Sequence, residues 1–419
     1  MCLESWAMKS SYKRIGDYIQ LVDQRNKGLK VKQLLGLSIS KQFIPSVANI
    51  IGTDMENYKI IRKNQFACST MQVRRDKKMP VALLQEVDEA IISQAYPIFE
   101  VKNTDELDPE YLMMWFTRSE FDREACFHAV GGVRGSLEWE DFENLKLPIP
   151  HIDKQREIVK EYNTIQSRIN LNQQMIQKLE ETAQAIYKQW FVEFEFPDEN
   201  GKPYKSNGGD MVWCEELGRD IPKGWEVGKL SDILECNPET LSSKDDFKDI
   251  LYLDTSSITN NRITELQELD LEKDEIPSRA RRKVKGNDII FSTVRPALKH
   301  YGIIKNLPIN LIVSTGFSVF RVKESNFTSE LIYSFLTDEN TIAYLQAKAE
   351  MSVSTYPSVT SNDILNLDFV RPDNTILVLT SDIFKSKDDF INLKNKENQK
   401  LSELKELLLS KLATVEGAQ

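Results

Sequence analysis

Two short segments of the chain combine many cationic side chains with almost no acidic ones. Residues 59–78 carry seven Lys or Arg against Asp76 alone, and residues 277–305 carry eight against Asp288 alone. Clustered Lys and Arg bind the phosphates of a duplex and gain affinity by releasing counterions. One basic run is usually a solvated surface, but two runs at equivalent positions of a repeat, described below, favour a surface that contacts phosphates.

Side chains that can read bases lie beside these segments. Arg recognises guanine with two hydrogen bonds, and Asn or Gln recognises adenine in the same way. Residues 131–136 and 353–358 are two further candidate loops, and the glycines of the first permit close backbone approach. The residues predicted to bind DNA are Arg62, Lys63, Ser69, Thr70, Gln72, Arg74, Arg75, Arg134, Arg279, Arg281, Arg282, Lys283, Ser292, Thr293, Arg295, Lys299, Ser354 and Tyr356.

No residue pattern in the sequence indicates catalysis or metal binding. The phosphate-binding motif G-x-x-x-x-G-K-[ST] is absent, and so is the Asn/Asp-Pro-Pro-aromatic motif with which amino-methyltransferases hold a flipped base. Three histidines stand alone, and five cysteines are scattered without a C-x-x-C pair, which argues against a zinc site and a disulfide framework. We therefore expect no catalytic residue, no metal and no cofactor in this chain.

The composition indicates a globular protein of a reducing compartment. A length of 419 residues allows two or three domains, and 41% of the residues are apolar. The sequence lacks a run of about 18 apolar residues and an apolar signal core, so we expect a cytoplasmic protein. The net charge of -10 argues against a simple basic coat for nucleic acid, but residues 1–80 are net basic and residues 81–150 net acidic.

The chain repeats itself at a shift of 220 to 223 residues. Five segments match in order, and each shares identical residues with its counterpart. Such collinear matches with a nearly constant shift indicate an internal duplication. The matching pairs are residues 64–70 with 287–293, 93–101 with 314–322, 110–117 with 330–337, 144–150 with 366–372, and 177–179 with 399–401.

Each repeat has the pattern of an α/β (α+β) globular unit followed by a long helix. Short apolar runs predict strands, and amphipathic stretches around residues 111–116 and 331–336 predict helices. The predicted globular units are residues 1–150 and 222–372. The predicted long helices are residues 151–196 and 373–419, and residues 197–221, rich in Pro, Gly and Asn, form a predicted linker.

The first long helix carries a strict heptad stripe, which is typical of a coiled coil. Asn172 is the one polar member, of the kind that sets register. We expect the two long helices to pair with each other in an antiparallel coiled coil. The alternative is that each helix packs on its own globular unit. The first stripe is Ile158, Tyr162, Ile165, Ile169, Asn172, Ile176, Leu179, Ala183, Ile186 and Trp190, and the second is Ile383, Phe390, Leu393, Leu401, Leu404, Leu408 and Leu412.

This duplicated plan resembles the DNA specificity subunit of type I restriction-modification systems, and the resemblance covers residues 11–413. The duplication is the specific signal, because single motifs are weak in these diverged domains. Residues 43–47 depart from the family form that residues 251–256 show. The similar segments are residues 225–232, 251–256, 286–296, 147–150 and 153–158.

The resemblance implies two target-recognition domains that each read one half of a split target in double-stranded DNA. The paired helices would hold the halves apart, and a helix of about 35 residues is about 50 Å long. The implied partners are two methyltransferase subunits and restriction/translocase subunits, which would carry S-adenosylmethionine, ATP and Mg. We expect no interaction with a membrane. An exposed apolar surface formed by Tyr187, Trp190, Phe191 and Phe194 is the expected methyltransferase docking site, unless these aromatics close the end of the coiled coil.

Two other functions remain open at this point. One is the specificity subunit of a related system in which one partner polypeptide combines restriction and methylation. The other is a coiled-coil scaffold that does not bind DNA, for which reversing the charges of Arg281, Arg282 and Arg295 would leave function intact.

Overall fold

The computed structural model describes residues 12–46, 53–131, 135–242, 244–305, 308–351 and 357–414. The fold divides into two compact units. The first unit consists of Met1–Leu171 together with Glu397–Gln419, and the second is Asn172–Lys396. Arg134, Ser354 and Tyr356, which the sequence predicts to bind DNA, lie outside the described residues.

The first unit is built on a four-stranded antiparallel sheet in the order β2-β9-β6-β7. Of its two central strands, β6 is apolar and fully buried, and β9 is buried except at half-buried Glu100. Phe66 of β6 stacks on Phe99 of β9 with 4.9 Å between the ring centroids. The strands are β2 (Ile19–Val22), β9 (Ile98–Val101), β6 (Phe66–Cys68) and β7 (Val81–Leu83).

Two strand pairs form a second layer of the first unit. One pair is β3 (Leu35–Leu37) with β4 (Phe43–Pro45), and the other is β5 (Lys59–Arg62) with β8 (Glu89–Ile92). A parallel bridge between Leu34 and Ile91 joins β3 to β8. Residues 43–45, which belong to the segment that departs from the family form, thus form β4 and pair with β3.

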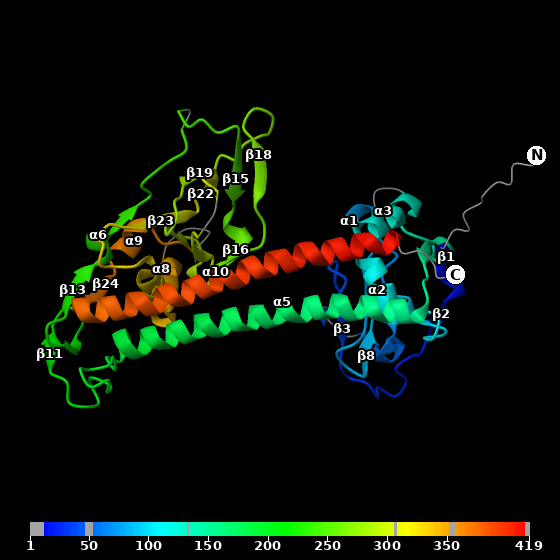
Figure 1. The fold of residues 1–419 in the computed structure, drawn as a ribbon, viewed down its shortest axis with the longest axis horizontal. Coiled ribbons are helices and arrows are strands. Elements are labelled where there is room, and N and C mark those ends of the chain that lie inside the picture. Colours follow the sequence, from blue (N-terminus) through cyan, green and yellow to red (C-terminus); the bar gives the residue numbers. More distant parts are fainter. Residues whose placement is uncertain are drawn as a thin grey trace, which may run out of the picture. The chain divides into compact units, whose positions relative to one another are not determined.

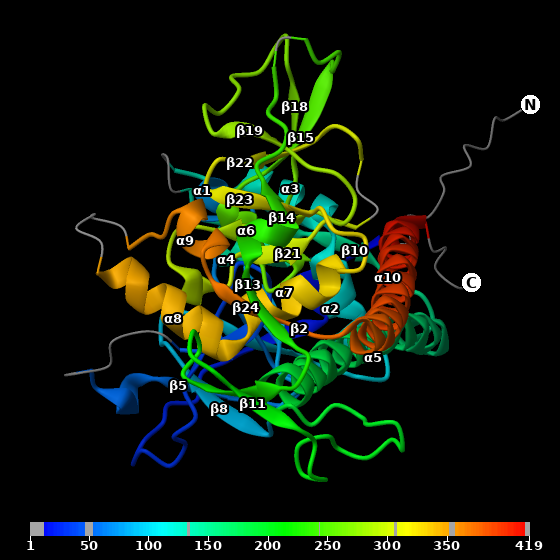
Figure 2. The ribbon, with the colours of Figure 1, turned by 90° about the vertical axis from the view of Figure 1, so that its left-hand side faces the viewer.

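The second unit repeats this plan, and most of its strands are labelled in Figure 2. One sheet has the order β14-β23-β20-β21, and the other has the order β18-β15-β22-β19, in which β15 and β22 are parallel. Apolar side chains of β15, β20, β22 and β23 pack the two sheets together. The strands are β14 (Leu234–Cys236), β15 (Asp249–Leu253), β18 (Gln267–Asp270), β19 (Ala280–Lys283), β20 (Ile289–Ser292), β21 (Tyr301–Ile303), β22 (Leu311–Ser314) and β23 (Phe317–Val322), with a small hairpin of β16 (Ile258–Thr259) and β17 (Arg262–Ile263).

Short helices occur in both units, and the last three of each unit stand at equivalent places. Asp108 caps the first of them by accepting a hydrogen bond from the Glu110 backbone N–H at 2.8 Å, and Pro109 occupies the first turn, where its missing N–H costs nothing. The helices are α1 (Val73–Asp76), α2 (Pro109–Thr117), α3 (Ser119–His128) and α4 (Trp139–Asn144) in the first unit, and α6 (Leu230–Ile233), α7 (Ser329–Thr337), α8 (Glu339–Glu350) and α9 (Ser361–Leu365) in the second.

In each repeat the first strand of the globular part, the region before the long helix, pairs with its last strand. The long helix follows that last strand directly. In the first unit β1 (Tyr12–Arg14) pairs with β10 (Lys146–Pro148), and in the second β13 (Glu226–Lys229) pairs with β24 (Asp368–Arg371). The predicted linker is structured in part, because β11 (Met211–Cys214) and β12 (Arg219–Pro222) form a hairpin. The duplication predicted from sequence is therefore visible strand by strand.

The two long helices are α5 (Ile152–Tyr187) and α10 (Asn374–Lys411). A π-helical turn, Lys188–Val192, continues α5, and a 3-10 turn, Leu412–Thr414, ends α10. All ten stripe positions predicted for α5 are buried or half-buried, which confirms its apolar face.

The stripe predicted for α10 is partly wrong. Phe390, Leu393 and Leu404 are exposed. The covered face of α10 has the same alternating spacing of three and four residues as that of α5, but it includes polar side chains. A stripe drawn through the apolar residues alone therefore falls partly on the exposed face. The covered positions are Leu377, Thr380, Phe384, Lys387, Ile391, Lys394, Asn398, Leu401, Lys405, Leu408 and Leu412.

Segments of α5 and α10 contact each other in both units. In the first unit Lys405 lies 5.6 Å from the Tyr162 ring, and Arg168 Nε donates to Glu397 at 2.6 Å. Leu409 and Leu412 join the core of the first globular part, and Tyr12 Oη donates to the Ala413 carbonyl at 3.0 Å. Since higher numbers in one helix face lower numbers in the other, these segments are antiparallel.

In the second unit the end of α5 lies beside the start of α10 (Figure 1). Glu180 of α5 interacts with Lys387 of α10. Phe191, which follows Glu180 along the chain, and Asp373, which precedes Lys387, both contact Trp225. The segments in this unit are also antiparallel. The alternative in which each helix packs only on its own repeat is therefore wrong.

Candidate nucleic-acid interface

Each unit carries a strained loop directly after the central strand of its first sheet. We define the first basic loop as residues 69–78, which follow β6, and the second basic loop as residues 292–299, which end β20 and contain the 3-10 turn Pro296–Leu298. Gln72 and Lys77 have positive φ angles of 64° and 50°, and Arg295 and Lys299, at the equivalent positions, have 46° and 58°. Non-glycine residues rarely adopt this conformation, and such strain concentrates at functional sites.

Backbone hydrogen bonds join each basic loop to the second candidate loop of its repeat. The Leu137 N–H donates to the Thr70 carbonyl at 2.9 Å, and the Val359 N–H donates to the Thr293 carbonyl at 2.9 Å. Gly135 adopts a φ of 39°, and a Cβ there would lie 2.6 Å from the Arg74 Cβ. In each repeat the residue that directly follows the second candidate loop thus adjoins the basic loop.

In each unit a helix, α3 in the first and α8 in the second, makes hydrogen bonds to the segment that carries the basic loop. In the first unit Cys126 of α3 donates to the Val73 carbonyl at 3.4 Å, and the Asp122 carboxylate accepts the Met79 N–H at 3.0 Å. Asp122 also pairs with buried Lys41 at 2.8 Å, and burial lowers the pKa of Lys41 although this ion pair opposes the shift.

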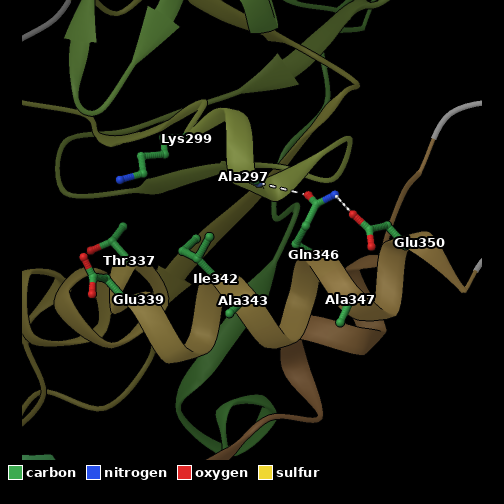
Figure 3. A pocket seen from close by; sticks show the side chains of 9 residues that line it. All are labelled: Ala297, Lys299, Thr337, Glu339, Ile342, Ala343, Gln346, Ala347 and Glu350. Carbon is green, nitrogen blue, oxygen red and sulfur yellow. Dashed lines mark hydrogen bonds between the residues drawn. The ribbon is translucent and has the colours of Figure 1, made fainter.

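In the second unit Gln346 of α8 braces the basic loop. Its Oε1 accepts the Ala297 N–H at 3.1 Å, and its Nε2 donates to Glu350 at 2.8 Å (Figure 3). A groove of about 360 Å³ lies between this loop and α8, with Ile342 and alanines on its floor and Lys299 at its edge. Sequence reasoning missed Asp122, Lys41 and Gln346, because bracing contacts between distant segments leave no spacing pattern.

The cations predicted in the first unit are on the surface. Arg62, Lys63, Arg74 and Arg75 are exposed, and Ser69, Thr70 and Gln72 are half-buried. Arg75 Nε lies 2.6 Å from Asp76 Oδ1, and this hydrogen bond raises the pKa of Arg75. The positive charge of the first basic loop therefore faces solvent.

The structure separates the second basic segment into two parts. Arg295, Lys299 and half-buried Thr293 belong to the second basic loop. Arg279, Arg281, Arg282 and Lys283 lie instead at or on β19 of the other sheet. The Thr315 N–H donates to the Arg279 carbonyl at 2.8 Å and the Thr293 N–H donates to the Gly316 carbonyl at 3.0 Å, so the Arg279 end of β19 adjoins the loop.

Two residues predicted to bind DNA have structural roles. Ser292 is buried, and its hydroxyl donates to the Val294 carbonyl at 3.1 Å. Lys283, at the far end of β19, forms an ion pair with Asp245 and lies 5.8 Å from the Phe247 ring. These contacts hold Ser292 and Lys283 within the unit, and their predicted contact with DNA stays a prediction.

The predicted exposed aromatic surface at the end of α5 is also wrong. Tyr187, Phe191 and Phe194 are buried, and Trp190 is half-buried against the same core. The rings of Phe191 and Phe194 lie 5.9 Å and 5.8 Å from that of Trp225. Phe194 has a φ of 63°, and this turn folds the aromatics onto the second globular part. These side chains anchor the helix and do not form a free surface.

Within the described ranges, no helix is long and apolar enough to cross a membrane. The same part of the chain holds no group of three or more His, Cys, Asp or Glu side chains placed to bind a metal ion.

Comparison with known proteins places the chain in a family. The profile of the type I restriction modification DNA specificity domain matches residues 47–181 and again residues 222–403, which together exceed half of the chain. The chain is 27% identical over 187 residues to the type I restriction enzyme HindI specificity subunit of Haemophilus influenzae, covering 44% of this chain and 39% of that protein. It is 21% identical over 279 residues to the MjaVIII specificity subunit of Methanocaldococcus jannaschii, covering 65% and 62%. The matched regions thus span less than two thirds of these relatives.

The fold is shared with a solved structure. The crystal structure of the type I restriction-modification system S subunit from M. genitalium superposes with a TM-score of 0.54 at 13% identity, over 96% of this chain and 95% of that one. The repeated profile match, the repeated sheets and this fold agree. The chain belongs to the family of type I restriction-modification DNA specificity proteins.

Proposed function

We propose that this chain is the non-catalytic recognition subunit of a type I restriction-modification complex, and that each repeat reads one half of a split DNA target. The observation that carries the proposal is the repetition of the strained basic loop, with left-handed residues at equivalent positions. Two loops of one geometry with different side chains suit one docking mode that reads two different sequences.

The proposed DNA-contacting residues are the exposed or half-buried side chains of the basic loops and their neighbours. We propose that cations such as Arg75 and Lys299 bind phosphates and that Gln72 and Arg295 contact base edges. The proposed set is Arg62, Lys63, Ser69, Thr70, Gln72, Arg74, Arg75, Arg279, Arg281, Arg282, Thr293, Arg295 and Lys299, with Arg134, Ser354 and Tyr356 outside the described residues.

We further propose that α5 and α10 form an antiparallel coiled coil that sets the distance between the half-sites. Support comes from the antiparallel contacts in each unit and from the heptad spacing of both covered faces. A helix of 36 residues, the length of α5, is about 54 Å long, which is about one and a half turns of duplex.

Methyltransferase subunits are the proposed partners of the outer face of α10. Val378, Leu393, Leu404 and Leu407 are exposed there, and such a stripe on a helix suits the apolar face of a partner helix. S-adenosylmethionine, ATP and Mg would be carried by the methyltransferase and by restriction/translocase subunits. One partner polypeptide that combines restriction and methylation would bind the same outer face of α10.

Co-expression with a methyltransferase partner tests this function. We expect the complex to methylate a split motif that sequencing of modified DNA reveals, and the chain alone to methylate nothing. The double variant Arg74→Glu/Arg75→Glu should abolish modification, whereas Lys178→Glu, an exposed change on α5, should not. A complex without sequence preference would overturn the proposal, and normal modification by the loop variant would favour a scaffold without DNA contacts.

A further inference from the structure

Exposed apolar side chains stand next to both basic loops. In the first unit Phe127 is 81% exposed, and Met71 and Val130 are also exposed. In the second unit Met351 is 84% exposed and Leu298 is also exposed. Covering such large apolar side chains is favourable, and their place beside both cationic loops suits a partner that binds there.

Phe127 lies in the last turn of α3, which packs against the first basic loop. The neighbouring Cys126 donates to the Val73 carbonyl at 3.4 Å, and Val130 exchanges two backbone hydrogen bonds with Ser136 at 2.9 Å. The chain then reaches Leu137, whose N–H is bound to Thr70. Phe127 therefore stands at the edge of the surface that carries Arg74 and Arg75.

Met351 occupies the corresponding corner of the second unit. The hydrogen bonds from Ala297 to Gln346 and from Gln346 to Glu350 hold the end of α8 against the second basic loop (Figure 3). Met351 is the residue directly after this helix. Leu298, inside the loop, supplies a second exposed apolar side chain beside Arg295 and Lys299.

The chemistry of these side chains selects their target. Phenyl and thioether groups cannot bind phosphates, but in a groove they can contact thymine methyl groups or partly unstack a base step. The surrounding cations provide the charge complementarity that brings a duplex to this surface. A protein partner would require a larger continuous apolar patch than one or two side chains per unit.

We propose that Phe127 and Met351 contact bases in the DNA groove and so determine sequence specificity, one in each half of the target. This inference rests on the proposed function, since it assigns apolar base contacts to the same DNA surface. It predicts that the apolar and the cationic residues have separable effects. The apolar residues determine which sequence is bound, and the cationic residues determine the affinity for any duplex.

The test uses the full chain in complex with its methyltransferase partner. Methylation rates and binding are measured on duplexes with the target intact, with the first half changed, or with the second half changed. We expect Phe127→Ala to lose about tenfold discrimination in one half-site only, and Met351→Ala to lose about tenfold in the other half only. Phe127→Leu, which keeps an apolar group, should retain part of the discrimination.

Two controls separate this effect from others. Trp213→Ala removes an aromatic that is 64% exposed on the β11–β12 hairpin, and it should leave discrimination unchanged. Arg75→Ala should weaken binding to all duplexes and reduce the slope of log affinity against log salt by about 1, whereas Phe127→Ala should not change this slope.

Unchanged discrimination by both Phe127→Ala and Met351→Ala would overturn this inference alone. Loss of co-assembly with the methyltransferase at unchanged sequence preference would also overturn it, and would identify a protein contact instead. A wild-type complex without any sequence preference would overturn both this inference and the proposed function. Melting curves of the variants should match the wild type, because both side chains are almost fully exposed.

Discussion

A buried ionic cluster in the second unit makes its stability depend on Lys305. The Lys305 ammonium donates to the Glu330 carboxylate of α7 and to Asn287 Oδ1 at 2.7 Å, and it lies 3.5 Å from Asp388 of α10. Asp388 pairs in turn with Lys387 at 2.8 Å. Each charged side chain of this cluster is largely buried, so the cluster ties the globular part of the unit to α10.

Lys305→Met removes one cation and leaves Glu330 and Asp388 buried without it. Removing one partner of a buried ion pair costs about 3–5 kcal/mol. For a domain of this size, each 1 kcal/mol lowers Tm by about 2–4 °C. The unfolding transition of the second unit should therefore fall by about 6–20 °C at neutral pH.

The loss should shrink on acidification. Burial acts to raise the pKa of Glu330, but its hydrogen bond and charge interaction with Lys305 hold that pKa below its ordinary value. A depressed carboxyl pKa contributes stability that is present above the unfolded pKa and is lost as pH falls. In Lys305→Met the pKa of Glu330 should rise, so protonation relieves the unpaired charge at pH 5 but not at pH 8.

Calorimetric unfolding at pH 8 and pH 5 measures both effects. Lys273→Met is the matched control, because Lys273 pairs with Asp270 at 2.8 Å but is 74% exposed, and exposed pairs contribute about 0–1 kcal/mol. If Lys305→Met were no less stable than Lys273→Met at pH 8, the argument for a stabilising buried cluster would be refuted. An equal loss at both pH values would refute the role assigned to Glu330.

Three further outcomes are expected. Gly135→Ala should cost about 1–2 kcal/mol, because its φ is 39° and the new Cβ would meet Arg74, and modified DNA should show relaxed sequence preference in one half-site only. Asp363 should titrate at a pKa of about 2, chiefly because of its hydrogen bond with Lys348, so its stabilising contribution should be lost only as pH falls from about 4 towards 2, which an NMR titration measures. Phe194→Ala should destabilise the second unit by about 3–5 kcal/mol in denaturant unfolding, since its ring is buried.

The repeat and the first heptad stripe were predictable from sequence because both are local patterns. Matched segments mark equivalent strands, and the stripe from Ile158 to Trp190 marks the covered face of α5. The covered face of α10 was not predictable by the same count, because Lys387, Lys394 and Lys405 place their stems along it while apolar Leu393 and Leu404 point outward.

The candidate site was predictable in its charge but not in its geometry. Clustered Arg and Lys indicated an exposed cationic surface, and Ser69 and Thr293 indicated the strand ends that carry the loops. The left-handed turns at Gln72 and Arg295 involve no glycine, so composition gave no sign of them. Burial of Phe194 depends on Trp225, which lies beyond the hairpin and was read as a separate feature.

The composition of the two units has a consequence for how the chain can be divided. The first unit contains the last turns of α10, where Leu409 and Leu412 join the core of the first repeat. A cut near Gly208, which lies in the exposed turn before β11, would separate the repeats but leave each fragment without a helix segment that its partner supplies. The fragments should therefore fold only by mutual complementation, with a midpoint of unfolding that rises with concentration.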